Sequence, residues 1–170
     1  DPKNPLGYHL LFAPDVCQGP DGRYYLYYAF DFLGIMSVAV CDTPAGEYKF
    51  LGHIHYADGT LWGRRRGDQL PFDPGVLVDD DGRVWLYSGF YNALPAILTG
   101  GHKLRCDGGT VLELEKDMVT IKTEPRVIFP KKGPGAFQGH EFFEASSIRK
   151  EGKTYIFVYS SRHNHELCYA

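Results

Sequence analysis

The feature of this sequence that most constrains its fold is a layout that occurs three times, in residues 15–28, 73–88 and 144–160. Each copy opens at a carboxylate, crosses a short apolar run, turns at an acidic residue followed by glycine, and returns on a run rich in aromatic residues. Glycine supplies the positive φ that a tight reversal of the chain needs. Each copy therefore predicts a β-hairpin.

The spacing of the three copies predicts a larger repeat. Their turn glycines are 60 and 70 residues apart, which leaves room for a four-stranded unit with loops each time. Repeats of this size built from short strands are typical of the blades of a β-propeller. In such a fold the innermost strand of each blade lines the central axis. We therefore expect Asp15, Asp73 and Glu144, which open these strands, to face one pocket.

The rest of the chain also favours an all-β fold. Apolar residues alternate or occur in short runs between Gly, Pro and Asp, and no window of about 12 residues shows the 3.6-residue period of an amphipathic helix. The predicted strands are Tyr24–Ala29, Ile35–Cys41, Tyr48–His55, Val76–Val78, Val84–Gly89, Thr110–Glu115, Val119–Thr123, Ser147–Lys150 and Thr154–Ser160, and the C-terminal residues 166–170 also have the pattern of a strand.

Composition excludes several classes of protein. With 18 Lys and Arg against 21 Asp and Glu, the chain lacks the cationic excess that nucleic-acid binding requires. It has no run of about 20 apolar residues, so no bilayer-spanning helix is predicted. The 4 cysteines are scattered without a CxxC pair, which predicts free thiols rather than a zinc knuckle or a disulfide scaffold.

Three motifs in this order resemble glycoside hydrolase family 43, the five-bladed propeller enzymes that act on arabinose- and xylose-containing polysaccharides. They are Phe-Ala-Pro-Asp-Val at residues 12–16, Phe-Asp-Pro at 72–74, and Phe-Glu-Ala-Ser-Ser-Ile-Arg-Lys at 143–150, each followed by its hairpin. The resemblance extends over essentially the whole chain. It implies a glycosidase of the α-L-arabinofuranosidase or β-xylosidase type with a carbohydrate substrate.

The resemblance also implies roles for individual residues. Glu144 matches the general acid of the family, and Asp73 matches the third carboxylate, which tunes the pKa of the acid and orients it. Asp15 lies in the motif that shapes the sugar-binding floor, where Phe12 replaces the commoner Trp. Phe90 is a further candidate for a flat ring on which a sugar packs.

The catalytic base of the family is an Asp that opens the first blade and has its own hairpin. Residues 1–11 contain no such hairpin, so the resemblance implies that the first blade is missing. Since the sequence also ends within a predicted strand, we expect residues 1–170 to form a partial catalytic propeller domain of roughly three blades out of five. The chain is then processed or a fragment.

The expected chemistry is inverting hydrolysis, in which a carboxylic acid protonates the leaving oxygen while an opposed carboxylate activates water. We expect burial beside Phe142 and Phe143 and repulsion from an ionised Asp73 to raise the pKa of Glu144. Glu141 is a rival for the acid, but it does not occupy the position just before the inner strand.

Two other functions stay open. The retaining invertase and fructosidase propellers usually have Arg-Asp-Pro and Glu-Cys at the places where this chain has residues 72–74 and Glu144-Ala145. A non-catalytic carbohydrate-binding propeller is the second alternative. The histidine pairs at 53/55 and 163/165 have no evident acidic or cysteine partner, so no metal ligand is predicted and no cofactor is required, although the resemblance allows a structural calcium ion in a complete propeller.

Overall fold

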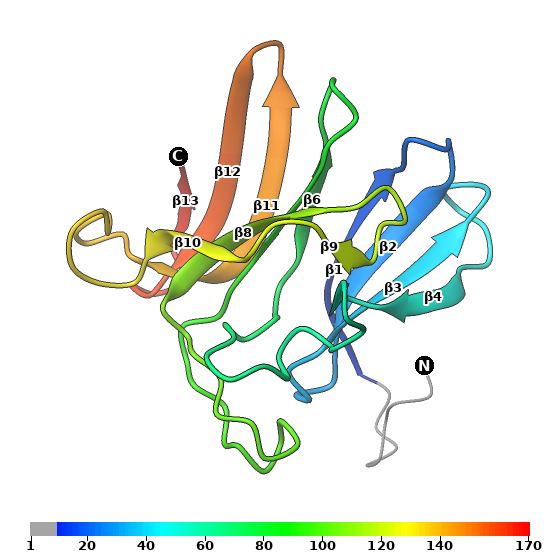
Figure 1. Cartoon of the computed structure of the whole chain (residues 1–170). Helices are drawn as coiled ribbons and strands as arrows, with labels where there is room; N and C mark the ends of the chain where they lie inside the picture. The colour runs from blue at the N-terminus through cyan, green and yellow to red at the C-terminus, as the bar shows by residue number, and fades with distance from the viewer. Residues whose placement is uncertain (1–9) are drawn as a thin grey trace.

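The computed structural model describes residues 10–170, which form strands, turns and loops with no helix in that part of the chain (Figure 1). The all-β prediction is therefore confirmed. The strands form three largely antiparallel sheets that follow one another along the sequence. None of the described segments is a helix long and apolar enough to cross a membrane. The prediction that no hairpin precedes Phe12 concerns mainly residues 1–9, which lie outside the described part.

The first sheet is a meander of four strands in the order β1-β2-β3-β4. The strands are β1 (Leu11–Gln18), β2 (Tyr24–Phe30), β3 (Met36–Cys41) and β4 (Lys49–His53). The aromatic-rich return strand β2 occupies the middle of this sheet and is mostly buried. Tyr27 is fully buried there and its hydroxyl donates to the carbonyl oxygen of Met118, 2.8 Å away in the next sheet.

The second sheet has the order β5-β9-β8-β7-β6, and β10 pairs with β8 in addition. Its strands are β5 (His55–Tyr56), β6 (Gly75–Val78), β7 (Val84–Ser88), β8 (Gly108–Leu114), β9 (Thr120–Ile121) and β10 (Arg126–Pro130). All seven residues of β8 are buried, as expected for a strand with neighbours on both edges. The short strand β5 is parallel to β9 and joins the end of the first meander to this sheet.

The third sheet has the order β11-β12-β13, with β11 (Phe142–Glu151), β12 (Thr154–Ser161) and β13 (Leu167–Tyr169). The predicted C-terminal strand is therefore present. Among the described residues no strand pairing joins the first sheet to the third, so the sheets do not close into a ring.

The three hairpins predicted from the repeated layout are all present. Their turns contain Gly22, Gly82 and Gly152, with φ angles of 84°, 76° and 58°. They connect β1 to β2, β6 to β7 and β11 to β12. Since a side chain is disfavoured at such φ angles, the glycine in each turn explains why these local predictions succeed.

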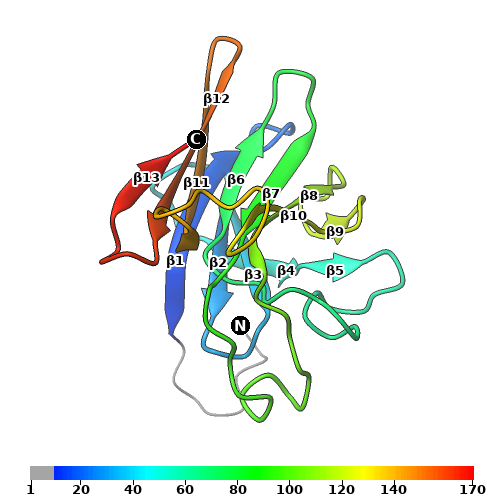
Figure 2. The ribbon, with the colours of Figure 1, turned by 90° about the vertical axis from the view of Figure 1, so that its left-hand side faces the viewer.

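The first strands of the three hairpins come together in space. Strand β6 contacts β1 on one side and β11 on the other, and Figure 2 shows the three strands near the middle of the molecule. The approach is close, because a Cβ on Gly75 of β6 would lie 2.7 Å from the carbonyl oxygen of Ser146. The beginnings of β1, β6 and β11 are therefore neighbours, as a propeller arrangement requires.

Two of the apolar cores lie between neighbouring sheets. The larger core lies between the first and second sheets around fully buried Trp62. The smaller core contains Phe142, Ile148, Phe157 and Tyr159 of the third sheet, against which Leu77, Tyr87 and Phe129 of the second sheet pack. Phe142 is therefore a core residue, 1% exposed.

Some strand boundaries differ from the predictions. Strand β10 was not predicted, and β11 begins at Phe142 instead of Ser147. The predicted strand 48–55 is divided into β4 and β5, with a break at Ile54. The reason in β11 is that its pairing shifts register twice between Phe142 and Ser147, which interrupts the alternation of inward and outward side chains. All 4 cysteines are free thiols, as predicted.

Candidate active site

Asp15 and Asp73 each bridge two neighbouring sheets. Oδ2 of Asp15 accepts a hydrogen bond of 2.9 Å from the backbone N–H of Val76, and Oδ2 of Asp73 accepts one of 2.8 Å from the backbone N–H of Ala145. The carboxylate at the first sheet thus contacts the inner strand of the second, and the carboxylate before β6 contacts the inner strand of the third. Both residues hold the sheets together, whatever else they do.

The carboxyls of Asp73 and Glu144 both have a raised pKa, chiefly because both are buried to some degree. Asp73 is only 5% exposed. Burial raises the pKa of its carboxyl to about 7, the N–H of Ala145 opposes that rise, and the charge of Glu144 adds to it. Burial also raises the pKa of Glu144, and His165, whose Nδ1 lies 3.6 Å from Oε1 of Glu144, opposes that rise.

The pKa of Glu144 is raised, as expected, but the pKa of Asp73 is raised as well, which was not expected. We expected an ionised Asp73 to keep Glu144 protonated, whereas the structure raises the pKa of Asp73 to about 7. The cause is geometric, because the Asp73 side chain is buried while that of Glu144 is 28% exposed.

The position of Glu144 depends on an unusual backbone. Ala13, Asp73 and Ala145 occupy equivalent places in the three hairpins and all have positive φ, at 42°, 49° and 61°. Such angles cost about 1–2 kcal/mol for a residue other than glycine and concentrate at functional sites. In β1 and β11 these residues lie at register shifts of the strand pairing. Bulges of this kind redirect a side chain next to an active site.

This alignment corrects one expectation. The three carboxylates do not occupy the same position of the repeat. Glu144 precedes the residue of positive φ, Asp73 is that residue, and Asp15 follows it by two places, at the start of the regular ladder opposite Tyr27. The contacts bring Asp73 and Glu144 together. In contrast, one carboxylate oxygen of Asp15 accepts the backbone N–H of Val76, and the other lies 3.2 Å from the guanidinium of Arg149.

A row of aromatic rings runs beside the carboxylates. The ring centroids of Phe12 and Phe72 are 5.6 Å apart, those of Phe72 and Phe90 4.9 Å, and those of Phe90 and Phe143 5.6 Å. Phe72 and Phe143 immediately precede Asp73 and Glu144 in the sequence. Phe12 and Phe90 are partly buried in this row, where they pack against a small core.

Two neighbours of Glu144 were not singled out as site residues from the sequence. The imidazole of His165 faces Glu144 and also meets the ring of Phe143 edge-on, with centroids 4.8 Å apart. The backbone N–H of Ala145 neutralises part of the charge on Asp73. We expected no acidic partner for His163 and His165, but in the structure each of these histidines lies beside a carboxylate.

Glu141 is not equivalent to Glu144. Its Oε2 lies 2.7 Å from Nε2 of His163. Hydrogen bonds from its own backbone amide and from His163 lower the pKa of Glu141. A carboxyl with a lowered pKa is a poor proton donor near neutral pH, so Glu141 is poorly suited to the role of the acid. Phe142 turns into the core, so of the two phenylalanines that we expected beside Glu144 only Phe143 borders the site.

Comparison with known proteins identifies the family. The sequence pattern described as "Glycosyl hydrolases family 43" matches residues 2–168. The chain belongs to glycoside hydrolase family 43. A xylosidase/arabinosidase of Thermoclostridium stercorarium is 53% identical over 174 residues, covering 100% of this chain and 35% of the relative. A second, xylosidase/arabinosidase 43A of Humicola insolens, is 32% identical over 92% of this chain and 52% of its own length.

Solved structures of family 43 enzymes have the same fold. A β-xylosidase/α-arabinofuranosidase from a compost microbial metagenome, solved with xylotriose, superimposes with a TM-score of 0.68 at 28% identity, covering 94% of this chain and 52% of that one. A family 43 enzyme from Xanthomonas citri, solved with xylose, gives a TM-score of 0.67 at 25% identity, covering 94% and 50%. The chain therefore spans between about a third and half of the length of these relatives.

Proposed function

We propose that the protein is a glycosidase that hydrolyses O-glycosidic bonds of xylose- or arabinose-containing oligosaccharides with inversion, and that Glu144 is its general acid. The observation that carries this proposal is that the carboxyls of Asp73 and Glu144, both with a raised pKa, lie beside a row of aromatic rings. Family membership and relatives described as xylosidase/arabinosidase support the substrate class.

The geometry explains how Glu144 would donate a proton. In the free protein its side chain is 28% exposed, so water still stabilises the charged form. A sugar over the row of rings would displace that water and raise the pKa of Glu144 further, toward the operating pH. Asp73 acts beside it as a buried carboxyl that accepts the backbone N–H of Ala145, next to the acid. In this assignment Asp73 is a positioning residue.

The base of an inverting glycosidase lies about 6.5–9.5 Å from the acid and activates a water molecule. Asp15 is unsuited to that role, because one of its oxygens accepts from Val76 and the other faces Arg149. We therefore assign the base to residues outside the described range and give Asp15, with Phe12 and Phe90, a part in the sugar-binding floor. Asp15 would orient that floor by holding β1 to β6.

The same reasoning gives the domain architecture. We propose that the three sheets are three blades of a five-bladed propeller and that residues 1–170 are part of its catalytic domain. The adjacency of β1, β6 and β11 supports this, since inner strands of consecutive blades surround the axis.

The family resemblance allows a structural calcium ion in a complete propeller. Calcium takes about six to eight oxygen ligands. Within residues 10–170 the group of three potential metal ligands that lie close together contains a thiol and an imidazole, not an oxygen cage. We therefore derive no catalytic step from a metal ion.

The test is Glu144→Gln in the full-length protein, assayed on two classes of substrate. If Glu144 donates the proton, hydrolysis of xylosides or arabinofuranosides with poor leaving groups is lost by at least about 100-fold, while aryl glycosides with good leaving groups retain much more of their rate. Glu141→Gln is the matched control. It should lower the rate of hydrolysis only slightly, and by the same factor for both classes of substrate. Equal large losses for both classes in Glu144→Gln would refute the assignment.

Product stereochemistry tests the reaction type. NMR of the first-formed sugar should show the anomer opposite to that of the substrate. Retention of configuration would favour a covalent mechanism, as in the fructosidase propellers, and would contradict our proposal.

A further inference from the structure

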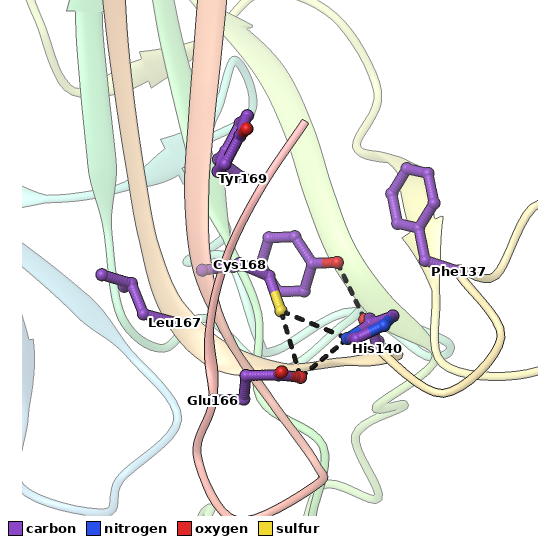
Figure 3. Close-up of a pocket in the computed structure, with 7 residues that line it drawn as sticks. Phe137, His140, Glu166, Leu167, Cys168 and Tyr169 are labelled. Atoms are coloured by element: carbon purple, nitrogen blue, oxygen red, sulfur yellow. Dashed lines mark hydrogen bonds and ion pairs between the residues drawn. The ribbon is translucent and has the colours of Figure 1, made fainter.

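A second cluster of reactive side chains lies in the third sheet, formed by His140, Glu166 and Cys168 (Figure 3). His140 comes from the loop before β11, and Glu166 and Cys168 alternate on one face at β13. Nδ1 of His140 is 2.7 Å from Oε2 of Glu166 and 3.9 Å from Sγ of Cys168, and Sγ is 3.8 Å from the same carboxylate oxygen. Three donor atoms of different chemistry therefore converge on one point.

The arrangement is not that of a thiol activated by a histidine. In such a relay the thiol uses one ring nitrogen and the orienting carboxylate uses the other. Here both Cys168 and Glu166 face Nδ1 of His140. Donor atoms that meet in this way can all bond to a single ion at their common focus.

The distances suit a tetrahedral ion after a small adjustment. With zinc bonds of about 2.0 Å to nitrogen or oxygen and about 2.3 Å to sulfur, tetrahedral geometry separates the ligand atoms by about 3.3–3.6 Å. The two distances from sulfur are a few tenths of an ångström longer than this. The contact between imidazole and carboxylate must widen by about 0.6 Å, which follows when the ion takes the place of the hydrogen bond between them.

The backbone already holds the ligands in place. The N–H of His140 donates to the carbonyl oxygen of Phe137 and its own carbonyl oxygen accepts from the hydroxyl of Tyr159, both at 2.8 Å. The carbonyl oxygen of Glu166 accepts from the N–H of Ser161, also at 2.8 Å. A site organised in advance loses less conformational entropy on binding. The three ligands line a pocket of about 270 Å³, which leaves space for water as a fourth ligand.

We propose that His140, Glu166 and Cys168 bind one zinc-type divalent cation. The thiolate and imidazole select a borderline-soft metal over calcium or magnesium, which prefer oxygen alone. Binding releases the thiol proton of Cys168 and joins the loop before β11 to strand β13. Because His140 lies four residues before Glu144, the ion would fix the segment that leads into the general acid.

The test measures metal binding and does not depend on glycosidase activity. The full-length protein, freed of metal and then dialysed against a slight excess of Zn²⁺, should retain one equivalent by elemental analysis. With Co²⁺ in place of Zn²⁺, a thiolate-to-metal charge-transfer band should appear in the near ultraviolet. Cys168→Ser should remove the band and His140→Ala should weaken Zn²⁺ binding at least tenfold. Cys41→Ser, which changes another partly exposed thiol, should leave both unchanged.

A folding control keeps the result interpretable. Zn²⁺ should raise the thermal midpoint of the wild type and of Cys41→Ser and leave that of a cooperatively unfolding Cys168→Ser variant unmoved. Failure of the wild type to retain zinc, or a charge-transfer band that survives in Cys168→Ser, would overturn the proposal. Neither outcome bears on Glu144 as the general acid, so the two proposals fail separately.

Discussion

Replacing Asp73 by Asn should change how the stability of the protein depends on pH. The folded protein holds the proton of Asp73 up to a pKa of about 7, whereas an unfolded aspartate loses it near the ordinary value of 3.8. Between these values the folded state binds more protons than the unfolded state. The stabilisation that this supplies is therefore complete below pH 3.8 and is lost as the pH rises through 7.

The expected size of the effect follows from the same two pKa values. They differ by about 3 pKa units, and each is worth about 1.4 kcal/mol, which gives about 4 kcal/mol. Screening by solvent reduces this little, because Asp73 is 5% exposed. Asn has no proton to lose and keeps an oxygen that accepts from the N–H of Ala145. Relative to the wild type, Asp73→Asn should therefore gain about 4 kcal/mol in the free energy of unfolding between pH 3.5 and pH 8.

The assay is urea unfolding at a series of pH values, followed by tryptophan fluorescence, to which the fully buried Trp62 contributes. Asp79→Asn is the matched control, because hydrogen bonds from Lys150 and Tyr155 lower the pKa of Asp79 to about 2. Its difference from the wild type should stay constant above pH 5 and shrink only in acid. If the free energy of unfolding of Asp73→Asn changed with pH in parallel with that of the wild type, the raised pKa of Asp73 would be refuted.

Four other substitutions test the packing and the proposed sugar floor. Gly108→Ala should lower the free energy of unfolding by at least about 3 kcal/mol, because its Cβ would lie 2.0 Å from a carbonyl oxygen of β10. Gly82→Ala is the control. No atom lies within 4 Å of its Cβ, so it should lower the free energy of unfolding by only about 1 kcal/mol in the same thermal or urea unfolding assay. Lys150→Met should lower the free energy of unfolding in that assay, since it removes the ammonium that pairs with the carboxylate of Asp79. Phe90→Ala should raise KM about tenfold with a smaller change in kcat if its ring supports the sugar, and a change confined to kcat would contradict that role.

The parts of the fold that the sequence predicted are those determined by local chemistry. The three hairpins depend on glycines at positive φ between apolar runs, and each lies where the pattern indicated. Strand β10 was not predicted, because it pairs with β8, which is not the preceding strand in the sequence, and no local pattern marks that pairing. The start of β11 was placed too late because the register shifts around Glu144 interrupt the alternation on which a strand prediction depends.

The candidate site shows a similar division. The motifs indicated Asp73 and Glu144 as partners, and the charge of Glu144 does act on Asp73. Which carboxyl has the more strongly raised pKa depends on how much water reaches each, and that is a property of the assembled sheets. His140 was not predicted as a ligand, because it lies 26 residues before Glu166 in the sequence. The alternating pair Glu166 and Cys168 was the sequence feature that could have indicated a metal site.

The assembly of the sheets and the chemistry of the site depend on the same contact. The carboxylate of Asp73 accepts the N–H of Ala145, which holds the second sheet to the third and at the same time places Glu144 beside it. The backbone strain at Asp73 and Ala145, about 1–2 kcal/mol each, persists because relaxing either residue would break that contact. A substitution that relieves the strain without touching a carboxylate, such as Ala145→Gly, should therefore preserve or raise stability while lowering kcat. The acid would then be held less firmly, although both carboxyls remain.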